Sequence, residues 1–134
     1  MKEIDFEIVK CEIDTDLTLT ADNIGDKLYK IPNLHSKYLR LYYQESLVLE
    51  KLEAKLARLY KKLFKYYTTE VDYIVKPAQA NFFIFGDDKY SEAKFVVSKQ
   101  KLQVDYLERT LKKVNNLSFD IKNLVEWSVF QNGG

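Results

Sequence analysis

Several residue types are nearly missing from this chain, and each scarcity excludes a class of structure. There is one cysteine, Cys11, so no intramolecular disulfide and no zinc site built on several cysteines is available. The single histidine, His35, argues against a histidine-based metal site. No apolar run is long enough for a membrane helix and no signal-peptide pattern is present, so we expect a cytoplasmic protein. Only 4 glycines and 2 prolines occur, which favours long helices.

The residues that are present have the composition of a soluble, folded chain. Its 134 residues have the size of a single domain, with 46% apolar and 31% charged residues. Lysine and arginine number 21 against 20 aspartates and glutamates, a formal charge of +1. Because the chain as a whole is not basic, any nucleic-acid site must come from charges arranged locally.

The spacing of apolar residues and breaks predicts an all-α fold in five segments. These are an acidic N-terminal arm with a short helix over 1–30, a long basic helix over 33–69, an aromatic linker over 70–88, a second long helix over 88–116 and a C-terminal helix over 118–130.

The arm has eight acidic residues and four lysines in its thirty positions. Ile4, Phe6 and Ile8 alternate with charged residues, which suits a short strand or an irregular arm. Thr20 could cap a short helix that runs to Tyr29, and Pro32 should then break the chain.

The first long helix has a sustained apolar seam. Asn33 is a plausible N-cap, and no glycine or proline follows it as far as Thr69. Apolar residues recur at spacings of 3 or 4, with Glu45 filling one place: Leu34, Tyr38, Leu41, Val48, Leu52, Leu56, Leu59, Leu63 and Tyr66. Such a helix would be roughly 50 Å long. The seam therefore needs a partner, from the same chain or from another copy.

The rest of the chain continues this pattern. A short extended segment is possible at Phe82–Phe85 in the linker, and Asp87 or Asp88 should start the second helix. Its seam comprises Tyr90, Ala93, Val97, Val104, Leu107, Leu111 and Val114, with polar Gln100 in one place. Asn115 and Asn116 should end it, and Ser118 could cap the C-terminal helix.

The strongest local signal is a row of basic residues in the first long helix. Lys51, Lys55, Arg58, Lys62 and Lys65 are spaced 4, 3, 4 and 3 apart, so they share one helical face, and Lys61 flanks them. This stretch has six basic residues and one acid, Glu53, a local charge of +5. A basic row can follow a phosphate backbone, and the interleaved Tyr60, Phe64, Tyr66 and Tyr67 could stack on bases. Such a row predicts binding that is largely independent of sequence.

The same residues also fit simpler interpretations. A lysine row opposite an apolar seam is often a solvated face, and the tyrosines could be seam residues. The chain would then be a coiled-coil scaffold or adaptor without nucleic-acid binding. A calmodulin-target or membrane-surface helix fits less well, because the seam extends far beyond the basic segment.

Nothing in the sequence points to catalysis, a metal or a cofactor. Glu50 and Glu53 lack the Glu-x-x-His units of a di-metal bundle. His35 suits capping or packing at a helix start, and Cys11 suits a buried or inert thiol. Gly86 and the acids after it fit a turn and a helix start better than a phosphate loop. We expect a protein that is not an enzyme.

Large aromatic residues close the chain. Trp127 and Phe130 could belong to the core, or they could anchor an interface between subunits.

Many short elements follow one another along the chain: Ile31-Pro32, Leu34-His35, Lys37-Tyr38, Tyr42 with Glu45, Leu49 with Leu52-Glu53, Leu59-Tyr60-Lys61, Tyr66-Tyr67, Val71-Asp72-Tyr73-Ile74, Lys76-Pro77, Gly86-Asp87, Tyr106-Leu107-Glu108, Leu111-Lys112, Ile121-Lys122-Asn123 and Val125-Glu126-Trp127. Their order and spacing, over about residues 13–130, resemble the UvsY family of phage recombination mediators.

The resemblance implies a small helical protein that assembles into a homo-oligomeric ring of six or seven copies. It implies binding to single-stranded DNA and assistance to a RecA-like recombinase as that protein displaces a single-strand DNA-binding protein. In that family the basic residues that contact DNA come just before the Tyr-Tyr pair. Lys61 stands at a matching position, and Lys62 and Lys65 lie beside it. The family's C-terminal helix contributes to assembly, which fits Leu124, Trp127 and Phe130.

Overall fold

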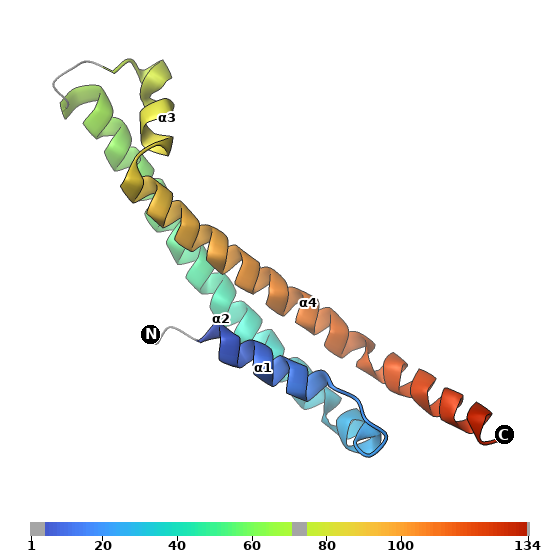
Figure 1. Ribbon diagram of the computed structural model, residues 1–134. Helices are drawn as coiled ribbons and strands as arrows, with labels where there is room; N and C mark the ends of the chain where they lie inside the picture. The colour runs from blue at the N-terminus through green and yellow to red at the C-terminus, as the bar shows by residue number, and fades with distance from the viewer. Residues whose placement is uncertain (1–4, 71–74, 134) are drawn as a thin grey trace. The chain divides into compact units, whose positions relative to one another are not determined.

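The computed structural model describes residues 5–70 and 75–133. In this part of the chain the secondary structure is helical: α1 (Phe6–Leu17), α2 (Ile24–Lys65), the π-helical turn η1 (Tyr66–Glu70), α3 (Pro77–Phe85) and α4 (Asp88–Gln131) (Figure 1). The all-α prediction is confirmed. The chain divides into two compact units, one of Met1–Tyr43 with Asp105–Gly134 and one of Gln44–Val104.

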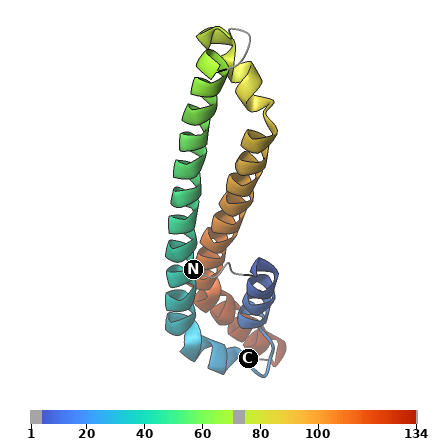
Figure 2. The ribbon, with the colours of Figure 1, turned by 90° about the vertical axis from the view of Figure 1, so that its left-hand side faces the viewer.

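The first unit packs α1 against the start of α2 and the second half of α4, which lie alongside one another in Figures 1 and 2. Its core is a single cluster of buried residues: Phe6, Val9 and Ile13 from α1, Leu34 and Tyr38 from α2, and Leu107, Leu111, Val114, Leu117 and Ile121 from α4. The spacings of 3 and 4 within each set put them on one face of each helix. The apolar seams therefore meet within the chain here.

A polar network ties α1 to α2 beside this core. The Asp16 carboxylate accepts hydrogen bonds from Lys37 Nζ, at 2.8 Å, and from the Tyr38 hydroxyl. Partial burial disfavours the Asp16 carboxylate, but these hydrogen bonds outweigh it and hold the pKa of Asp16 below its usual value. Burial is the main cause that raises the pKa of Tyr38, and the hydrogen bond to Asp16 raises it further, so the hydroxyl keeps its proton. The network thus fixes α1 on α2 with paired groups.

The expectation of a strand or irregular arm at the N-terminus is wrong over the described residues. Asp5 caps α1 by accepting from the backbone N of Glu7 at 3.1 Å. The period that decides the structure is Phe6, Val9 and Ile13, not the alternation of Ile4, Phe6 and Ile8; Ile8 is exposed, and Ile4 lies outside the described residues. Packing of that stripe against the unit's core makes the segment a helix.

The expected break at Pro32 does not occur either, because α2 runs through it. A proline inside a helix costs about 3 kcal/mol. Ile24 and Ile31 before it and Leu34 and Tyr38 after it all pack on the same core, and this burial outweighs the cost. The short helix expected to end at Tyr29 is thus the first part of α2.

Asn115 and Asn116 likewise fail to end the second helix. Both are exposed, whereas Val114, Leu117 and Ile121 continue the buried stripe of α4. The predicted C-terminal helix over 118–130 is therefore the last part of α4.

The second unit contains the end of α2, η1, α3 and the first part of α4. The predicted long helix ends at Lys65 rather than Thr69, where the hydroxyls of Thr68 and Thr69 donate to the carbonyls of Phe64 and Lys65. In the predicted linker, residues 71–74 lie outside the described residues. Residues 77–85 of this linker form α3, so the extended segment expected at 82–85 is wrong; Pro77 stands at the first turn of the helix, where proline is favourable.

The α3 helix folds back beside the end of α2 (Figure 2), where Leu63, Ala80 and Ile84 form a small buried core. Asp87 starts α4 as predicted, since its Oδ1 accepts from the backbone N of Lys89 at 2.9 Å. The two polar seam residues are both buried in this unit, and Gln100 Nε2 donates to the Glu45 carbonyl oxygen at 2.9 Å. The seams expected from the sequence thus meet here too.

Candidate nucleic-acid interface

The second half of α2 presents the basic row to solvent. The row comprises Lys51, Lys55, Arg58, Lys61, Lys62 and Lys65, all six of which are exposed. Leu52, Leu56, Leu59 and Leu63 occupy the other side of the helix and are partly or fully buried. The heptad-like spacing that buries the leucines is therefore what exposes the row.

No residue of the row forms an ion pair with a carboxylate in the part of the chain that the structure describes. The one acid among them, Glu53, lies 3.7 Å from Lys101 Nζ, so its carboxylate is engaged with another cation. Like charges repeated along a helix face repel one another. An anion laid along the row would relieve this repulsion.

The aromatic residues near the row divide into a buried and an accessible set. Tyr60 belongs to the packing: its hydroxyl contacts Asn81, and its ring lies 6.4 Å from Phe64 and 6.3 Å from Tyr90. Tyr60 and Phe64 are both partly buried against the core of the second unit. These two rings fix α3 on α2.

The pair Tyr66 and Tyr67 is split in the same way. Tyr67 is partly buried, stacks on Phe83 at 5.7 Å and donates its hydroxyl hydrogen to Asp87 Oδ2 at 2.7 Å. Tyr66 is 45% exposed and meets the Tyr67 ring edge-on at 5.1 Å. Of the two candidate stacking residues, Tyr66 is the one whose ring faces solvent.

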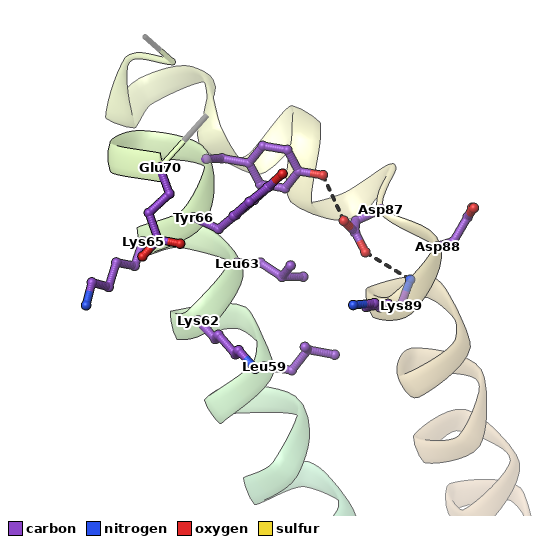
Figure 3. Close-up of a pocket in the computed structure, with 10 residues that line it drawn as sticks. Leu59, Lys62, Leu63, Lys65, Tyr66, Glu70, Asp87, Asp88 and Lys89 are labelled. Atoms are coloured by element: carbon purple, nitrogen blue, oxygen red, sulfur yellow. Dashed lines mark hydrogen bonds between the residues drawn. The ribbon is translucent and has the colours of Figure 1, made fainter. Parts of the chain in front are cut away.

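A pocket of about 590 Å³ adjoins the row in the second unit (Figure 3). Lys62 and Lys65 line it from α2, and Asp87, Asp88 and Lys89 line it from the start of α4. The remaining lining residues come from α2 and η1: Leu59, Leu63, Tyr66, Tyr67 and Glu70. Glu70 lies five residues beyond Lys65, at the end of η1, and is thus next to the row in the sequence. The sequence alone did not connect Lys89 with the row, because that proximity depends on the chain reversal that brings the start of α4 back to the end of α2.

The C-terminal end of α4 carries a second candidate surface, in the first unit. Leu124, Trp127 and Phe130 are 42%, 58% and 71% exposed, so the core-packing interpretation is wrong. The Trp127 and Phe130 rings stack with centroids 5.8 Å apart. Leu124 and Trp127 also line a groove of about 520 Å³, together with Leu19, Thr20 and Ile24.

The chemistry-bearing residues elsewhere are dispersed. Over the described residues, no three histidine, cysteine, aspartate or glutamate side chains gather as a metal site would require. His35 is partly buried on α2. Cys11 was expected to be a buried or inert thiol; it is exposed on α1, so the buried alternative is wrong. None of the helices described is both long and apolar enough to cross a membrane.

The fold and this surface define a class: an all-α protein of long helices, one of which exposes a cationic face that has no ion pair among residues 5–70 and 75–133. The chain belongs to the UvsY family, described as recombination, repair and ssDNA binding protein UvsY, whose model matches residues 12–134.

Two crystal structures of the recombination mediator protein UvsY of bacteriophage T4 share the fold. One matches with a TM-score of 0.83 at 16% identity over 96% of this chain and 99% of that one. The other gives 0.82 at 15% identity over 97% and 99%. Comparison with curated proteins gives no match.

Proposed function

We propose that this chain is a non-catalytic recombination mediator that binds single-stranded DNA along the basic row. The observation that carries the proposal is the exposure of six cations with no carboxylate partner among the described residues. Membership of a family described as binding single-stranded DNA supports the same assignment. No cofactor or metal is needed for this role.

The row suits a phosphate backbone. From Lys51 to Lys65 it extends about 21 Å along α2 at 1.5 Å per residue. Lysine and arginine bind the phosphates of a DNA strand whatever its base sequence. A single strand also keeps its bases free to stack on rings such as Tyr66. The expected binding is salt-dependent and tolerant of sequence.

The proposed action on the recombinase follows from repetition of the row in an oligomer. Several copies of the row would bend one strand over their surface and expose its bases differently from a single-strand DNA-binding protein. That change would lower the cost of nucleating a RecA-like recombinase on a covered strand. The proposed place of action is the host cytoplasm during phage infection.

The proposed assembly is a homo-oligomeric ring of six or seven copies. Leu124, Trp127 and Phe130 are its interface residues, because large exposed aromatic rings lose water contact favourably when a second copy covers them. Repetition of a cationic face around a ring strengthens the field that attracts DNA.

Fluorescence anisotropy of a labelled single-stranded oligonucleotide, titrated at several salt concentrations beside the matching duplex, tests the proposal. Tight binding to the single strand, weaker binding to the duplex and a steep fall with salt are expected. Absence of binding even at low salt would overturn the proposal and leave an oligomeric scaffold whose lysines serve solubility.

A further inference from the structure

The pocket beside the row contains a fixed and accessible aromatic ring. Tyr66 is 45% exposed, and the centroid of its ring lies 5.1 Å from that of Tyr67, with the two ring planes nearly perpendicular. Tyr67 is itself anchored through its hydroxyl to Asp87, and Asp87 is anchored to the backbone N of Lys89. A ring positioned in this way offers a face for stacking at little further cost in side-chain entropy.

The charges around this ring are of two kinds. Lys62 and Lys65 belong to the row and stand on the α2 side of the pocket (Figure 3). Glu70 and Asp88 are exposed acids on its lining, and neither forms an ion pair within the described residues. Asp87 differs from them, since hydrogen bonds from Tyr67 and the backbone already occupy its carboxylate and lower its pKa.

The charges and the ring determine which kind of ligand fits the pocket. The three carboxylates on the lining repel a free anion that sits deep in the pocket, and six charged side chains disfavour a purely apolar ligand. A nucleotide satisfies both kinds of charge, because its phosphate is anionic and its base can carry amino donors. Carboxylates accept hydrogen bonds from amino groups such as N4 of cytosine, and single strands leave these edges free. A volume of about 590 Å³ is within the range of small-ligand sites.

The geometry points to a base-binding subsite: one unstacked base that carries an amino group lies on Tyr66, donates to Glu70 or Asp88, and has its phosphate at Lys62 or Lys65. This inference rests on the proposed binding of single strands to the row. It adds a base preference that the row alone does not give. Cytosine should be favoured over thymine, which has no exocyclic amino group.

The test compares labelled oligo(dC) and oligo(dT) of equal length by anisotropy near pH 7.5. For the unaltered protein, the affinity ratio should favour oligo(dC) by roughly fivefold. Glu70→Gln/Asp88→Asn should reduce this ratio to about 1, because an amide offers a weaker acceptor and a competing donor. Tyr66→Ala should weaken both oligonucleotides, whereas Tyr66→Phe should retain the ring and the ratio.

A matched control separates base preference from charge. Glu50→Gln/Glu92→Gln removes two exposed acids of the second unit that do not line the pocket. It should raise affinity for both oligonucleotides about equally and leave their ratio unchanged.

The outcomes also separate this inference from the proposed function. Equal affinities for oligo(dC) and oligo(dT), or a ratio that survives Glu70→Gln/Asp88→Asn, would overturn the subsite and leave binding by the row intact. Failure to bind either oligonucleotide would overturn both.

Discussion

Neutralising part of the basic row should weaken binding to single-stranded DNA by an amount that depends on the salt concentration. The informative change is Lys51→Gln/Lys55→Gln/Arg58→Gln, because these three residues are exposed, have no ion pair in the described structure and do not line the pocket. Glutamine has nearly the helix propensity of lysine and arginine. The stability of the chain should therefore change by less than about 0.5 kcal/mol.

The magnitude follows from counterion release. Each phosphate contact on a single strand contributes about −0.7 to the slope of log K against log salt. Loss of three contacts should make the slope less negative by about 2. Between a 1 M reference and 0.1 M salt this difference amounts to about a hundredfold in affinity, or ~3 kcal/mol.

The assay is anisotropy with a labelled oligonucleotide over about 50–500 mM salt. A control variant, Lys94→Gln/Lys99→Gln/Lys112→Gln, changes the net charge equally with exposed lysines outside the row. If DNA lies along the row, the control keeps most of the slope. Equal losses of slope in the two variants would refute the row as the site and indicate attraction by overall charge.

Four further variants test the structure. Burial raises the pKa of the Glu45 carboxyl, so this group favours the folded state only where it is protonated; Glu45→Gln should stabilise the chain at neutral pH in denaturant titrations, and the gain should shrink as pH falls through the raised pKa. Tyr67→Phe removes the hydrogen bond to Asp87 and should cost about 1 kcal/mol in the same assay. Because the folded-state pKa of Asp87 is lowered, its contribution is present above the unfolded pKa and lost as pH falls through the folded one, so Tyr67→Phe should also flatten the acid limb of the stability profile. Leu107→Ala in the fully buried core of the first unit should cost about 2–5 kcal/mol, which thermal unfolding would register. Trp127→Ala/Phe130→Ala should lower the mass measured by light scattering without loss of helicity; an unchanged mass would exclude these rings as assembly anchors.

The sequence was sufficient to predict features that depend on local period. The seams of α2 and α4 were identified from spacings of 3 and 4, and the start of α4 was identified from Asp87 and Asp88. Five residues of the row were predicted to share one face with Lys61 beside them, and all six are exposed. These features need no knowledge of which segments meet.

Features decided by tertiary packing were mispredicted. Pro32 and the Asn115-Asn116 pair are local breaking signals, but the flanking apolar residues are buried in one core, which outweighs the local cost. Which tyrosines are engaged in packing and which are accessible also depends on tertiary contacts. Tyr60 and Tyr67 have the spacing of candidate stacking rings, yet contacts with Asn81 and Asp87, each about twenty residues further along the chain, engage them in the fold.

The polar seam residues explain how the pocket keeps its geometry. Glu45 and Gln100 are buried in the second unit, where neighbouring turns of the α2 seam present Val48 and Leu52. A slip of α4 along α2 by one turn, about 5.4 Å, would separate the Gln100 amide from the buried Glu45 carboxyl to which it hydrogen-bonds and set both groups against apolar side chains, at a cost of about 1–3 kcal/mol. The same slip would carry Asp87 out of reach of the Tyr67 hydroxyl. The buried polar pair therefore specifies the register that holds Tyr66 and the charged lining of the pocket beside the basic row. Burial of the Glu45 carboxyl lowers the free energy of unfolding, and Glu45→Gln would measure this loss.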